Sequence, residues 1–89
     1  MDEETRQNVT LGREHYNRGE FEKAEHYFRK VLEAGSAVAD VHNMLGLVHH
    51  DRGELELART CFEKALEINP RYTEAALNLA VTYNDLGRY

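Results

Sequence analysis

The sequence is poor in cysteine, proline and tryptophan. It has one cysteine, one proline and no tryptophan among 89 residues. The single cysteine, Cys61, excludes an intramolecular disulfide and every CxxC metal or redox motif. We therefore expect a reducing compartment, the cytoplasm. A periplasmic chain that had lost its export signal would have the same composition, so that location stays open as the alternative.

Clustered positive charge and long apolar runs are also missing. The chain has 11 Lys and Arg against 16 Asp and Glu, which gives a net charge of −5, and the cations are scattered. Phosphate binding needs a cluster of cations, and a membrane-spanning helix needs roughly 18 or more apolar residues in a row. We therefore expect no nucleic-acid partner and no insertion into a membrane.

Signatures of catalysis are absent from the sequence as well. It contains no nucleophile elbow, no glycine-rich phosphate loop and no HExxH motif. We therefore expect a protein that is not an enzyme and has no cofactor.

A histidine-based metal site is the alternative that the side chains leave open. Four of them could converge: His15, His49, His50 and Cys61. However, no two histidines stand four residues apart, the spacing that places two imidazoles around one ion on a helix. We expect packed imidazoles instead of metal ligands.

The chain repeats itself with a fixed period. Two sets of residues recur at intervals of 34: Leu11, Leu45, Leu79 and Gly19, Gly53, Gly87. A period between about 20 and 50 residues is typical of solenoids, in which each unit covers the apolar face of its neighbour. The sequence therefore predicts a stack of similar units.

Each unit shows the apolar spacing of α-helices. One face of a helix with 3.6 residues per turn carries Phe21, Ala24, Phe28, Val31 and Leu32. The pattern predicts five helices, at about residues 5–18, 21–34, 38–52, 55–68 and 73–87. We expect Gly19, Gly53 and Gly87 to end helices in the left-handed conformation.

The second unit has the spaced residues of a known family. These residues are Leu45, Gly46, Gly53, Ala58, Phe62, Ala65 and Pro70. In this set the chain resembles the tetratricopeptide repeat, whereas a pentatricopeptide repeat, which reads RNA, would have a period of 35 and a basic composition. The resemblance implies an all-α fold, a right-handed α-α superhelix of about two and a half helix-turn-helix repeats. The implied single domain covers residues 1–89, with repeat one at 5–38, repeat two at 39–72 and a truncated repeat three at 73–89.

The resemblance also implies a function. Such repeats are protein–protein interaction modules whose first helices line a concave groove. The implied groove residues are Val9, Arg13, Tyr16, Asn17, Asn43, Leu47, His50, Asp51, Leu77, Val81, Asn84 and Asp85. Apolar residues with an acidic rim predict an amphipathic, basic peptide or helix as the partner. The alternative is a scaffold segment that self-assembles through an exposed last helix, which carries Ala76, Ala80 and Tyr83.

Overall fold

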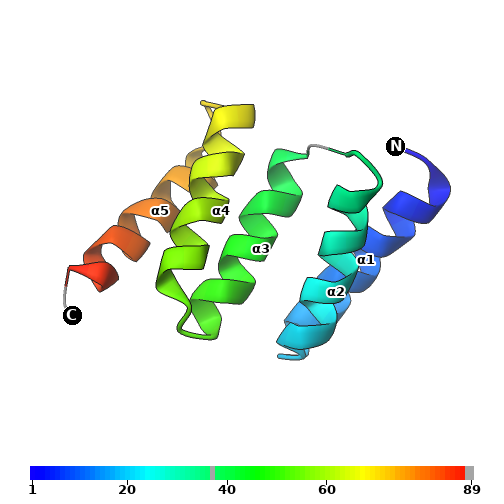
Figure 1. Ribbon diagram of the computed structural model, residues 1–89, viewed down its shortest axis with the longest axis horizontal. Helices are drawn as coiled ribbons and strands as arrows, with labels where there is room; N and C mark the ends of the chain where they lie inside the picture. The colour runs from blue at the N-terminus through cyan, green and yellow to red at the C-terminus, as the bar shows by residue number, and fades with distance from the viewer. Residues whose placement is uncertain (37, 88–89) are drawn as a thin grey trace. The chain divides into compact units, whose positions relative to one another are not determined.

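The computed structural model describes residues 1–36 and 38–87. Within these residues the chain forms five helices and no strand (Figure 1). Their bounds are α1 (Glu3–Asn17), α2 (Phe21–Glu33), α3 (Ala39–Asp51), α4 (Leu55–Ile68) and α5 (Thr73–Leu86). The predicted helices and the all-α class are confirmed, and each predicted bound lies within 2 residues of the observed one. The superhelical hand stays a prediction.

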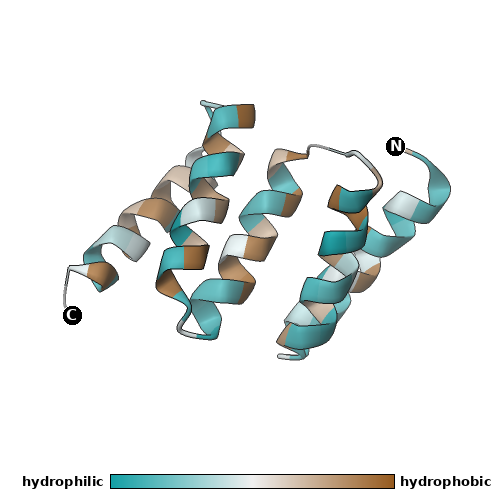
Figure 2. Ribbon diagram, viewed as in Figure 1, coloured by the Kyte–Doolittle hydropathy of each residue, from teal (hydrophilic) through white to brown (hydrophobic). Residues whose placement is uncertain are grey.

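The helices belong to two compact units. The first spans Met1–Ala37 and contains α1 and α2, and the second spans Val38–Tyr89 and contains α3, α4 and α5. In the second unit α4 packs against both α3 and α5. Both hydrophilic and hydrophobic residues lie along each helix (Figure 2), as helices with one buried face require.

The same glycine–phenylalanine contact holds α1 on α2 and α3 on α4. Phe28 and Phe62 are fully buried. A Cβ atom added to Gly12 would lie 2.5 Å from Cε1 of Phe28, and one added to Gly46 would lie 2.4 Å from Cε1 of Phe62. Because no side chain stands between them, the backbone of the first helix approaches the aromatic ring of the second. This packing contact therefore recurs after 34 residues, the same period that the sequence shows.

Helix ends show where the sequence patterns succeed and where they fail. Gly19 (φ 76°) and Gly53 (φ 78°) are left-handed, as predicted. The same prediction is wrong for Gly87, which has φ −70° and ψ −8°. Its backbone N–H donates to Tyr83 O, so it continues the helical turn of α5. α1 begins before the predicted residue 5 because the Asp2 side chain accepts a hydrogen bond from the Thr5 backbone N–H at 2.8 Å.

Candidate partner-binding surface

Eight of the twelve predicted groove residues lie in the second unit, on α3 and α5. Three side-chain hydrogen bonds join these two helices along their length. The Tyr72 hydroxyl donates to Asp40 at 2.8 Å, and Asn78 Nδ2 donates to Asn43 Oδ1 at 3.0 Å. Further along, His50 Nε2 lies 2.9 Å from Asp85 Oδ2. This row of polar contacts fixes α5 beside α3, so side chains of both helices contribute to one surface.

The contact between Tyr72 and Asp40 is half-buried. Burial of the phenol, together with its hydrogen bond to the Asp40 carboxylate, raises the pKa of Tyr72 to about 12. The hydroxyl therefore stays protonated, and able to donate, at any physiological pH.

Apolar side chains on this surface are open to solvent. Leu77 is 63% exposed and Val81 is 51% exposed, and both lie on α5. Leu47 of α3 is half-buried. We call the surface formed by Leu47, Leu77 and Val81 with their acidic neighbours Asp51 and Asp85 the α3–α5 face. Core packing does not account for the exposed aliphatic groups on it.

Asn43 is placed differently from the prediction. It is only 1% exposed and is occupied by its hydrogen bond with Asn78. A buried amide needs such a partner, because an unpaired polar group in the interior is costly. Asn43 therefore positions α5 and is not available to a ligand. Of the other predicted residues of this unit, Asn84 and Asp51 are exposed, and His50 and Asp85 are half-buried.

The remaining four predicted residues lie on α1 in the first unit. Arg13 and Asn17 are exposed, whereas Val9 and Tyr16 are half-buried. The Tyr16 ring packs against Phe21 of α2 with 5.7 Å between centroids. That these residues join the α3–α5 face in one groove stays a prediction.

Two histidine–glutamate pairs recur at the repeat period. His15 Nδ1 lies 2.8 Å from Glu20 Oε1, and His49 Nδ1 lies 2.8 Å from Glu54 Oε1. Each glutamate directly follows the left-handed glycine and starts the next helix. The histidine hydrogen bond holds the pKa of Glu20 below its usual value. The sequence analysis missed these pairs, although His and Glu five residues apart in both repeats was a signal for them.

Two of the histidines, His15 and His49, are packed side chains. The His15 ring stacks on Tyr27 with 5.4 Å between centroids, and His49 is 2% exposed. Burial and the nearby Lys64 ammonium lower the pKa of His42. Across residues 1–36 and 38–87, no three His, Cys, Asp or Glu side chains are grouped as metal ligands.

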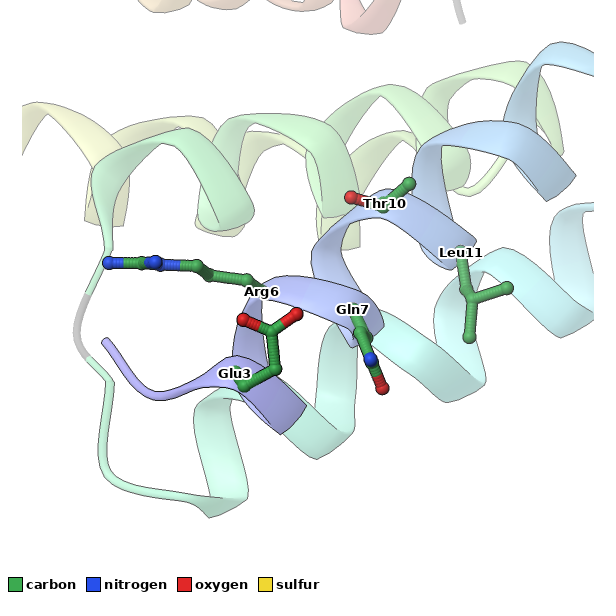
Figure 3. Close-up of a pocket in the computed structure, with 5 residues that line it drawn as sticks. All are labelled: Glu3, Arg6, Gln7, Thr10 and Leu11. Carbon is green, nitrogen blue, oxygen red and sulfur yellow. The ribbon is translucent and has the colours of Figure 1, made fainter.

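Two surface hollows differ in their relation to the α3–α5 face. One, of about 320 Å³, is lined by residues of α1 alone: Glu3, Arg6, Gln7, Thr10 and Leu11. Their side chains spread apart and do not converge on one point (Figure 3). The other, of about 570 Å³, lies in the second unit and is lined by His50, Gly53, Leu55, Glu56, Asp85 and Leu86. This second hollow contains two of the predicted groove residues.

Family models agree with the repeat geometry. A model described as a tetratricopeptide repeat matches residues 9–72, and a second with the same description matches residues 61–89. The chain belongs to the tetratricopeptide repeat family. Tetratricopeptide repeats are in general protein–protein interaction modules. No curated protein matches the chain significantly, and none of the described helices is long and apolar enough to cross a membrane.

Proposed function

We propose that the α3–α5 face binds an amphipathic, basic segment of a partner protein. The observation that carries the proposal is the pair of exposed aliphatic side chains, Leu77 and Val81, held beside α3 by buried or half-buried hydrogen bonds. Removing such groups from water on binding is favourable, at about 25 cal/mol per Å². A helix that lays an apolar stripe into a groove uses this contribution.

The acidic residues of α3 and α5 favour a basic partner segment. Asp40 and Glu74 lie near the N-terminal ends of α3 and α5, and Asp51 and Asp85 lie near the C-terminal ends. Carboxylates at both ends of an apolar strip complement lysine or arginine residues that flank the apolar residues of a ligand. An acidic segment would meet like charges at each end.

The test uses a synthetic helical peptide of about five turns, with leucines on one face and lysines on the other. Val81→Lys should weaken its binding roughly tenfold. Burying a valine side chain contributes about 1.5 kcal/mol, and about 1.4 kcal/mol changes affinity tenfold. Isothermal titration calorimetry measures the affinity directly.

Leu57→Lys provides the matched control. Leu57 lies on α4, outside the α3–α5 face, and is 51% exposed, the same fraction as Val81. Both variants add one positive charge, so a general repulsion of the peptide would weaken both equally. Equal affinities of the two variants for the peptide would contradict the proposed site.

A further inference from the structure

His50 is surrounded by carboxylates from three helices. On its own helix, α3, its Nδ1 lies 3.7 Å from Asp51 Oδ1. On α5, Asp85 Oδ2 lies 2.9 Å from its Nε2. From α4, Glu56 lines the same hollow of about 570 Å³ as His50 and Asp85. The imidazole is therefore placed where its charge acts on the acidic end of the α3–α5 face.

Two arginines near this cluster contact glutamates. Arg59 Nη2 lies 3.1 Å from Glu56 Oε1 on α4. In the turn before α4, Arg52 Nε lies 3.5 Å from Glu54 Oε1. Arg59 therefore offsets the charge of Glu56, whereas the imidazole of His50 contacts Asp51 and Asp85.

Protonation of His50 changes the charge that this end of the α3–α5 face presents to a ligand. A neutral imidazole with its proton on Nε2 donates to Asp85 and leaves the negative charge of both aspartates in place. A protonated imidazole adds one positive charge between them. Histidine is the side chain that makes this change between about pH 5 and 8. The side chain is 27% exposed and borders a hollow, so solvent protons reach it.

We propose that proton uptake by His50 weakens the binding of a basic segment to the α3–α5 face. The inference rests on the proposed function and adds a regulation to it. Above the titration range of the imidazole, Asp85 and Asp51 attract the lysine or arginine groups of the ligand. Below it, His50 neutralises part of this attraction and repels the same groups. Partly exposed charge pairs of this kind change affinity by about two- to fivefold.

The experiment measures the affinity of the leucine–lysine peptide by calorimetry at about pH 8 and about pH 5.5. The peptide has no histidine or carboxylate, and its ends are acetylated and amidated, so its own charge stays constant. The wild type should bind about two- to fivefold more weakly at the lower pH. His50→Gln, which keeps a side-chain N–H donor near Asp85 but cannot titrate, should lose most of this difference. His50→Lys, which carries its charge at both pH values, should bind weakly at both.

His26→Gln is the matched control, because His26 is an exposed histidine on α2 in the other unit. It should retain the pH dependence of the wild type. Thermal unfolding of every variant at both pH values verifies that the proteins compared are folded. Binding with the same pH dependence in His50→Gln as in the wild type overturns this inference and leaves the proposed function standing. Absence of peptide binding at every pH overturns both.

Discussion

In the α1–α2 and α3–α4 pairs, a glycine of the first helix lies against a phenylalanine ring of the second. At Gly46 a Cβ atom would lie 2.4 Å from Cε1 of Phe62, closer than two carbon atoms can approach without displacement. Phe62 is fully buried, so its ring has little free space into which to move. The identity of residue 46 and that of residue 62 are therefore coupled.

We expect Gly46→Ala to destabilise the protein by about 1–3 kcal/mol, the usual range for overpacking. The same change in a Phe62→Leu background should be much less harmful, because the smaller side chain leaves room for the added methyl group. There the higher helix propensity of alanine, worth about 1 kcal/mol, acts in the stabilising direction. Urea unfolding of the four proteins in this double-mutant cycle gives the coupling energy. Equal costs in both backgrounds would show that the ring and the glycine are not in contact.

Part-buried hydrogen bonds at single residues join α5 to α3, and α4 packs against both helices. Ala75 and Thr82 are the fully buried residues of α5, and both are small. Three hydrogen bonds, which involve Tyr72, Asn78 and His50, add to the packing of α5 on α4. The geometry of the α3–α5 face therefore depends on these polar pairs as well as on α4.

Tyr72 gives this helix pair a predictable response to alkaline pH. Burial and Asp40 raise its pKa in the folded protein to about 12, above the value of 10.0 for a free tyrosine. The folded state therefore holds the phenol proton more tightly than the unfolded state. Its contribution to stability is fully present below pH 10 and is lost as the pH rises from about 10 to about 12. Wild-type protein should lose more stability over this interval than Tyr72→Phe.

Chemical unfolding at several pH values between about 9 and 12 measures the effect. Tyr27→Phe serves as the control, because Tyr27 lies in the other unit, where its ring contacts His15 and His26. It should keep the alkaline loss of stability that the wild type shows. A Tyr72→Phe variant with the same alkaline slope as the wild type would remove Tyr72 from the explanation.

The helices could be predicted from the sequence more completely than the contacts between them. Apolar spacing and the recurring glycines predict all five helices, because one buried face and a helix-ending glycine are local requirements. Asn43 was assigned to a ligand surface because the family resemblance implies that its position lines the groove. Its burial depends on Asn78, which lies 35 residues away, and no local pattern contains that information.

Gly87 and the histidine–glutamate pairs show the same limit. Gly87 repeats the position of Gly53, but its φ of −70° continues the helix. The repeat pattern therefore predicts a glycine there without fixing its conformation. His15 and His49 occupy a slot that holds Tyr83 in the third repeat, so they were interpreted as aromatic packing alone. Their partners, Glu20 and Glu54, recur five residues later in both repeats, and the turn between the helices brings each pair into contact.

The charge of the whole molecule affects which partners approach it. With a net charge of −5, the protein attracts a basic segment over a distance set by the ionic strength. The Debye length is about 10 Å at 0.1 M salt and about 3 Å at 1 M. We expect the association rate constant of the leucine–lysine peptide to fall by about tenfold or more over this range. The dissociation rate should change less, because apolar contacts at Leu77 and Val81 are not screened.

Stopped-flow fluorescence with a labelled peptide separates the two rates. A peptide with glutamine in place of each lysine is the control, and its association should be nearly independent of salt. Self-association through Ala76, Ala80 and Tyr83 of α5, the alternative function, would have the opposite dependence on salt. Two copies that each carry −5 repel one another, so salt would favour their contact through apolar groups. Peptide association that is unchanged or faster at high salt would therefore argue against an acidic docking face.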